Sequence, residues 1–79
     1  MIIVAKLKAQ EGKEASLEAE LRDMVEKVAS EDGTVAYTLH KSSSDTALFM
    51  FYEKYKDAEA LTHHSSTPYF KALFRAIKP

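Results

Sequence analysis

Two side chains in the middle of the chain, His40 and Glu53, have the chemistry to move protons and flank an apolar stretch. Histidine is the side chain whose unperturbed pKa lies near neutrality, so His40, beside a polar turn, is the candidate general base. Glu53 would orient that histidine or bind a substrate hydroxyl. The alternatives are a strand-end histidine bonded to backbone and a carboxylate that is simply exposed near the end of its strand, and the sequence leaves both open.

Aromatic and histidine side chains form a second group of candidates around this pair. Tyrosine joins a large apolar ring to a polar hydroxyl, so it suits the wall of an aromatic-ligand pocket as well as a plain core position. The neighbours His63 and His64 point about 100° apart on a helix, which prevents them from chelating one ion. His40 is the only other histidine and there is no cysteine, so we expect no metal site. The candidate substrate-binding residues are Tyr37, Tyr52, Tyr55, His64 and Tyr69.

A predicted β-hairpin must position most of these residues. Residues 35–40 are rich in β-branched and aromatic side chains, residues 41–45 are turn formers, and residues 48–52 are continuously apolar. A strand that is apolar on both sides is central in a sheet and needs a packed layer on each face. If Thr38 pairs with Phe49, His40 and Glu53 share one face, whereas a one-residue slip separates them.

The remaining segments supply strands and helices around the hairpin. Residues 2–9 are expected to form a strand, and residues 13–30 a helix with one apolar stripe and Gly33 as its left-handed stop. Asp57 is the expected N-cap of a short helix over residues 58–64. Thr67 and Pro68 begin a last helix that runs to about Lys78. Its apolar stripe, expected to pack on the sheet, consists of Phe70, Leu73, Phe74 and Ile77.

The order β-α-β-β-α-α predicts a single α+β domain over residues 1–79 with a ferredoxin-like plan. That plan ends in a fourth strand, for which no residues follow Pro79. Helices on one side of a three-stranded sheet leave its other side bare. Because soluble monomers rarely expose a large apolar patch, we expect a homodimer.

Composition narrows the class of protein. Eleven basic and 12 acidic residues give a net charge of −1, which is not the footprint of a nucleic-acid or acidic-membrane partner. There is no cysteine, so disulfides and thiolate chemistry are excluded. The apolar run at the start is too short for a signal peptide or a membrane span, and we expect a cytoplasmic protein.

Four segments follow the opening strand in this order: GKEASLEAELRDMV, EDGTVAYTLH, FMFYEKYKDAEAL and HSSTPYFKAL. Together with that strand they resemble the antibiotic biosynthesis monooxygenase domain family (quinol-monooxygenase-like proteins). The most specific parts are the Tyr37-x-x-His40 strand, the Phe51-Tyr52-Glu53-x-Tyr55 strand, and His64 followed by Pro68 and Phe70. The resemblance covers essentially the whole chain and implies a dimeric α/β barrel in which two sheets pack face to face.

The resemblance also implies a range of activities. The family includes oxygenases that oxidise phenols and quinols without metal or flavin, haem-degrading enzymes, an isomerase of a signalling sugar phosphate, and members without known activity. This chain has Tyr55 where the family usually has tryptophan, and Tyr69 where it often has histidine. The haem-degrading branch relies on an asparagine and a tryptophan, and this sequence contains neither.

Three functions are therefore carried forward. The first is a small cofactor-independent monooxygenase that oxidises a phenolic, quinol or polyketide-like aromatic with dioxygen. The second is a non-catalytic ligand-binding or regulatory module of the same fold. The third is an isomerase of a small oxygenated metabolite, which a basic, phosphate-sized cluster in the pocket would favour. Fold alone does not separate them.

Overall fold

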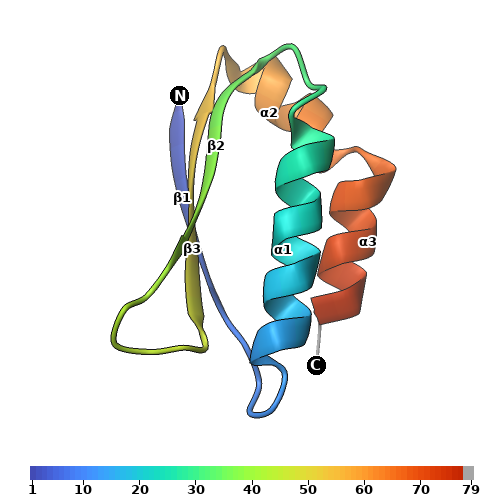
Figure 1. Cartoon of the computed structure of the whole chain (residues 1–79). Helices are drawn as coiled ribbons and strands as arrows, with labels where there is room; N and C mark the ends of the chain where they lie inside the picture. Colours follow the sequence, from blue (N-terminus) through green and yellow to red (C-terminus); the bar gives the residue numbers. More distant parts are fainter. Residues whose placement is uncertain (78–79) are drawn as a thin grey trace.

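The computed structural model of the chain describes residues 1–77 and has two layers, a three-stranded sheet and three helices on one side of it (Figure 1). The predicted order β-α-β-β-α-α is confirmed, and the predicted helix end near Lys78 lies outside the described residues. The elements are β1 (Ile2–Lys8), α1 (Glu14–Val28), β2 (Thr34–Lys41), β3 (Leu48–Tyr55), α2 (Ala58–Ser65) and α3 (Pro68–Ile77).

The apolar strand β3 is central, as its sequence predicts. The strand order is β1-β3-β2 and both pairings are antiparallel. The pairing that would bring His40 and Glu53 to one face is not formed, because Thr38 lies opposite Tyr52 and His40 lies opposite Met50. Side chains alternate along a strand, so Glu53 points to the helices while His40 points away from them.

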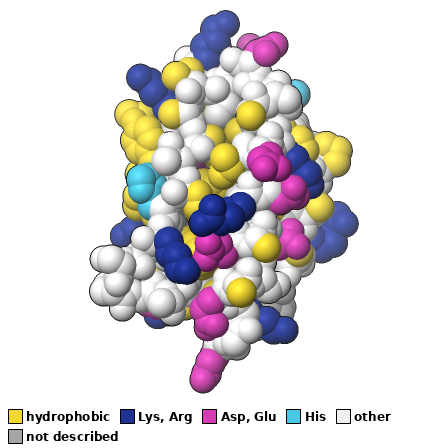
Figure 2. All heavy atoms as spheres, viewed as in Figure 1, with side chains coloured by type: hydrophobic (Ala, Val, Ile, Leu, Met, Phe, Trp, Pro, Cys, Tyr) yellow, Lys and Arg dark blue, Asp and Glu magenta, His cyan; other side chains and the backbone are white. Residues whose placement is uncertain are grey.

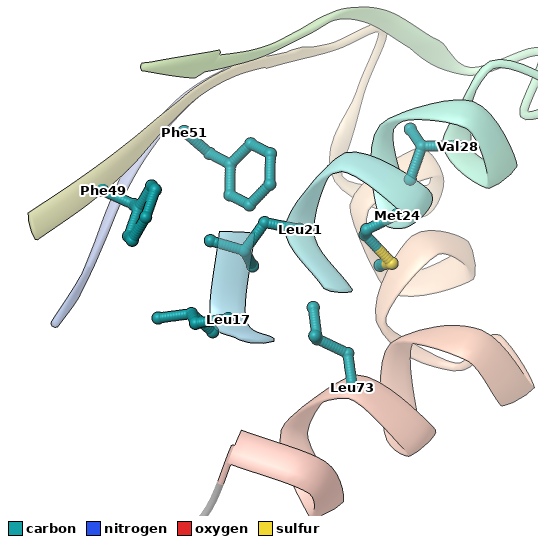
Figure 3. Close-up of a cluster of buried hydrophobic side chains, with 7 residues drawn as sticks. All are labelled: Leu17, Leu21, Met24, Val28, Phe49, Phe51 and Leu73. Carbon is teal, nitrogen blue, oxygen red and sulfur yellow. The ribbon is translucent and has the colours of Figure 1, made fainter. Parts of the chain in front are cut away.

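The hydrophobic core lies between the sheet and α1, and α3 completes it. Phe49 and Phe51 of β3 point toward Leu21 of α1, which is fully buried, and Leu73 of α3 closes the cluster from the other side (Figure 3). The stripe predicted on α3 is only partly correct. Leu73 is 5% exposed, but Phe74 is 47% exposed and does not pack on the sheet.

The structure confirms the two N-caps predicted at the helix starts but not the conformation predicted for Gly33. The Asp57 side chain accepts a hydrogen bond from the Ala60 backbone N–H at 2.9 Å, and the Thr67 hydroxyl accepts one from the Phe70 N–H at 3.2 Å. Both predicted N-caps are therefore confirmed. The prediction that Gly33 is left-handed is wrong, because in residues 1–77 the glycine with positive φ is Gly12. Gly33 is needed for space instead: a Cβ there would lie 2.4 Å from the Cβ of Ala60.

The face of the sheet opposite the helices is called here the open face. It carries His40, Met50 and Tyr52 together with Ile2 and Val4, which are 57% and 54% exposed. Figure 2 shows hydrophobic side chains along the sheet side of the molecule. The sequence predicts a layer on both faces of β3, and the helices of residues 1–77 cover one of them. None of these three helices is long and apolar enough to cross a membrane.

Candidate functional site

The candidate residues divide between the two faces of the sheet. Glu53 and Tyr55 of β3 and Tyr37 of β2 point toward the helices, where they meet His64 of α2 and Tyr69 of α3. His40 is exposed on the open face, and Tyr52 lies on the same face. His40 is therefore not buried against a cavity, which is the position that would favour it as the base.

A buried carboxylate that the sequence analysis missed, Glu31, is the centre of the inner cluster. It is 6% exposed, and both of its oxygens lie 3.1 Å from Nδ1 of His64. The Tyr69 hydroxyl donates to its Oε2, and the Thr34 hydroxyl donates to its Oε1 at 3.0 Å. The carboxylate thus has partners from three elements, which satisfies it inside the protein.

The turns around this cluster place its members. Glu31 follows the end of α1, and Thr34, three residues later, begins β2. His64 lies in the last turn of α2, where the Thr67 hydroxyl donates to its backbone oxygen at 2.8 Å. Tyr69 then stands in the first turn of α3. The missing side chain of Gly33 lets α2 approach closely enough for His64 to reach Glu31.

Aromatic rings surround the His64 imidazole. Their centroids lie 5.1 Å away for Phe70, 5.3 Å for Tyr37 and 5.4 Å for Tyr55. His64 is 1% exposed, so water is largely excluded from its ring. We call His64, Glu31 and these three rings the histidine cage.

A second carboxylate, Glu53, lies beside the cage. The Tyr55 hydroxyl donates to Glu53 Oε1 at 2.6 Å, and both residues are buried. Burial, followed by that hydrogen bond, raises the pKa of Tyr55 well above its ordinary value. Burial, with Glu53 and Glu31 nearby, does the same for Tyr37. Burial and the bond to Glu31 raise the pKa of Tyr69 to about 12. All three phenols are therefore protonated donors near neutral pH.

The geometry gives His64 a defined protonation pattern. Because the Glu31 carboxylate accepts from Nδ1, the neutral ring carries its hydrogen on Nδ1 and keeps Nε2 as the basic nitrogen. The buried carboxylate, the imidazole and the surrounding aromatic rings together form a buried acid–base cluster. Among residues 1–77 no three histidine or carboxylate side chains gather as a metal site would require.

The sequence gave only a weak indication that Glu31 is a buried site residue. It stands between a helix and a strand in EDGTVAYTLH, where an acidic residue is ordinarily part of a solvated turn. Its partner His64 is 33 positions away, and only the packing of α2 against β2 joins them. A glycine two residues after the carboxylate was the available hint, because it marks a close approach of two backbones.

A family model for antibiotic biosynthesis monooxygenases matches residues 1–76. The chain belongs to the antibiotic biosynthesis monooxygenase family. Solved structures agree with this assignment. PA3566 of Pseudomonas aeruginosa is 34% identical with a TM-score of 0.90, and the alignment covers 94% of this chain and 75% of that one. A Caulobacter crescentus protein, named as a candidate antibiotic biosynthesis monooxygenase, is 38% identical with a TM-score of 0.90, over 99% of this chain and 74% of its own.

The chain also has a longer relative among curated proteins. The uncharacterised protein sll1783 of Synechocystis is 26% identical over 70 residues, which are 89% of this chain and 48% of the relative. The chain thus spans about half the length of that curated relative. The family resemblance inferred from the sequence and the ferredoxin-like α+β fold are both confirmed.

Proposed function

We propose that this protein is a cofactor-independent monooxygenase that oxidises a phenolic, quinol or polyketide-like aromatic with dioxygen. One observation carries the proposal. The His64 imidazole is held through Nδ1 by a buried carboxylate while its other sides face aromatic rings. This arrangement suits a base that takes a proton from an aromatic substrate in a nearly dry site. Membership of the family supports the same chemistry.

The reaction needs a deprotonated substrate, because ground-state dioxygen is a triplet and reacts poorly with closed-shell neutral molecules. Nε2 of His64 accepts the proton, and Glu31 stabilises the resulting imidazolium. The substrate anion then gives its electrons to dioxygen. In an anthrone, one oxygen atom becomes the new carbonyl oxygen, and the other leaves as water with the two methylene hydrogens. The substrate supplies every electron, so the balance requires no external reductant.

The tyrosines hold the substrate in this proposal. Tyr69 and Tyr55 donate to the two buried carboxylates, and Tyr37 reaches the cage from β2. In the proposal, the Tyr55 and Tyr69 hydroxyls donate to the carboxylates and accept, with Glu53, a hydrogen bond from a hydroxyl of a phenol or quinol. His40 as the base and Tyr52 as a substrate contact remain predictions, and they would form a different site on the open face. The experiment below distinguishes that site from the histidine cage.

A homodimer formed through the open face is part of the proposal. Ile2 and Val4 on this face are 57% and 54% exposed. Face-to-face packing of two sheets would cover these side chains and give β3 its second layer. A cytoplasmic setting, without nucleic-acid or membrane partners, belongs to the same proposal.

The isomerase alternative would place a basic cluster next to the base. Three lysines, Lys6, Lys8 and Lys13, do line a groove of about 380 Å³ between β1 and the start of α1. Glu31 follows the opposite end of α1, so these lysines do not hold an anion at His64. The regulatory-module alternative predicts ligand binding without turnover.

Oxygen uptake with a panel of hydroquinones and anthrones tests the proposal, with chelator present and no flavin added. We expect uptake above the protein-free rate and a loss of about 10²-fold in His64→Gln, the scale of a lost general base. The matched control is His40→Gln, which should keep the wild-type rate. A loss of activity in His40→Gln alone would show that the base is on the open face. A loss of activity caused by the chelator would contradict the cofactor-free mechanism. No uptake with any substrate favours the non-catalytic module.

A further inference from the structure

Thr67 stands at the junction of α2 and α3, and its side chain bonds to residues on both sides of it. Two residues, Ser66 and Thr67, separate the end of α2 from the start of α3 (Figure 1). Thr67 is 7% exposed, so its hydroxyl is held inside the protein. A buried hydroxyl needs hydrogen-bond partners, and those of Thr67 belong to the histidine cage.

The Thr67 hydroxyl connects the residue that carries the base to a residue that carries one wall of the cage. It donates to the backbone oxygen of His64 at 2.8 Å and accepts from the Phe70 backbone N–H at 3.2 Å. The rings of His64 and Phe70 lie 5.1 Å apart with an interplanar angle of 74°. One oxygen atom therefore fixes the main chain of both residues, and with it the position of one ring against the other.

These bonds are part of a closed ring of contacts. From Thr67 the ring passes through His64 to Glu31, whose carboxylate oxygens both lie 3.1 Å from Nδ1 of the imidazole. The Tyr69 hydroxyl donates to the same carboxylate, and Tyr69 precedes Phe70, which leads back to Thr67. Each member of a closed ring is restrained from two directions, so the loss of one bond loosens the others.

We propose that Thr67 is a positioning residue, whose hydroxyl holds the imidazole of His64 in line with Glu31 and against Phe70. Glu31 orients the ring through Nδ1, and Thr67 fixes the backbone from which the ring extends. That backbone needs a restraint because His64 lies in the last turn of α2, where backbone oxygens have no partner within the helix. The effect of Thr67 on turnover rests on the proposed function, since Thr67 acts through the histidine.

Thr67→Val tests the inference, because valine keeps the branched shape of threonine and removes the hydroxyl. The first measurement is the NMR signal of the His64 Nδ1 proton in the full chain without substrate. A proton between an imidazole and a buried carboxylate exchanges slowly with water. We expect its exchange to become about tenfold faster in Thr67→Val, the scale of one lost buried hydrogen bond. Thr67→Ala should give the same acceleration, and Thr67→Ser, which retains the hydroxyl, should keep the wild-type rate.

The second measurement is oxygen uptake by the same variants. We expect kcat to fall by about tenfold in Thr67→Val, the lower end of the range for groups that orient a histidine, with KM unchanged. Thr67→Ser should keep the wild-type kcat. This difference between the two variants assigns the effect to the hydroxyl.

The matched control is Asp57→Ala, which removes the other predicted N-cap, at the end of α2 opposite to His64. It should lower the melting temperature as much as Thr67→Val does, while the His64 proton keeps its wild-type exchange rate. Equal acceleration in both variants would show that Thr67 only stabilises a helix, and it would overturn the inference. An unchanged exchange rate in Thr67→Val would overturn it as well.

The exchange measurement uses no substrate, so the two proposals fail separately. Absence of oxygen uptake by the wild type, with faster exchange in Thr67→Val, overturns the monooxygenase alone. Oxygen uptake by the wild type, with exchange and kcat both unchanged in Thr67→Val, overturns the role of Thr67 alone.

Discussion

The two faces of the sheet carry similar residue types in different surroundings. On the helix side, His64 meets a buried carboxylate and three aromatic rings. On the open face, His40 of β2 is exposed and lies opposite Met50 of β3. A histidine becomes an oriented base through its partners, so the first face fits the proposed reaction site and the second fits the proposed dimer interface.

The two faces also differ in how deeply their apolar side chains are buried. Phe51 is 2% exposed and lies in the core, whereas Val4, on the neighbouring strand, is 54% exposed. Both look like core positions in the sequence. The pleat of the strand decides between them, because successive side chains point to opposite faces.

The largest expected effect concerns the inner and outer sides of α3. Leu73→Ala should lower the free energy of unfolding by about 2–5 kcal/mol, because it opens a cavity in the core. Phe74→Ala, on the neighbouring residue, should cost less than about 1 kcal/mol, since that side chain is 47% exposed. Denaturant unfolding of both variants measures the difference. Equal losses would show that α3 is rotated about its axis.

The next effect separates orientation of the base from folding. Glu31→Gln keeps an acceptor for His64 but removes the charge that stabilises an imidazolium. We expect turnover to fall by about 10- to 100-fold, the scale for groups that orient a histidine. The melting temperature should change little compared with Glu31→Ala, which leaves buried donors without a partner. A rate unaffected by Glu31→Gln would contradict the role given to the pair.

A smaller effect tests the open face as an interface. If folding and dimerisation are coupled, each tenfold dilution should lower the apparent stability by about 1.4 kcal/mol. Val4→Lys places a charge in the middle of this face and should abolish the concentration dependence. Thermal melts over a dilution series, with sedimentation of the same samples, give both quantities. A stable wild-type monomer at micromolar concentration would rule out the dimer.

The smallest effect is a loss of stability at alkaline pH. The folded-state pKa of Tyr69 is raised to about 12, and those of Tyr37 and Tyr55 are raised further. A phenol with a raised folded pKa holds its proton more tightly when folded, so its contribution is complete below about pH 10, the unfolded value. That contribution is lost as pH rises toward 12 and beyond. Ultraviolet titration of the phenolates should show these three tyrosines ionising together with unfolding, and Tyr69→Phe should reduce the slope. Early ionisation of all tyrosines in the folded protein would contradict the burial.

Local sequence patterns were sufficient to predict the helices and strands. The pattern of the apolar residues predicted the strands, α1 and α3, and the Asp57 cap predicted α2. The caps at Asp57 and Thr67 were correct because a capping bond spans only three residues. The apolar run of β3 predicted its central place, since such a strand cannot face water on either side. The same local rules could not assign Phe74, because a helical stripe is wider than the part of it that meets the core.

Tertiary structure alone decided the site. The register of β2 on β3, fixed by packing over the whole sheet, sent His40 and Glu53 to opposite faces. Glu31 and His64 meet across 33 positions because α2 docks over Gly33, whose role is close approach rather than a left-handed turn. Partners so far apart leave no periodic signal in the chain. The sequence therefore determined which elements form, and their packing determined which histidine has a carboxylate behind it.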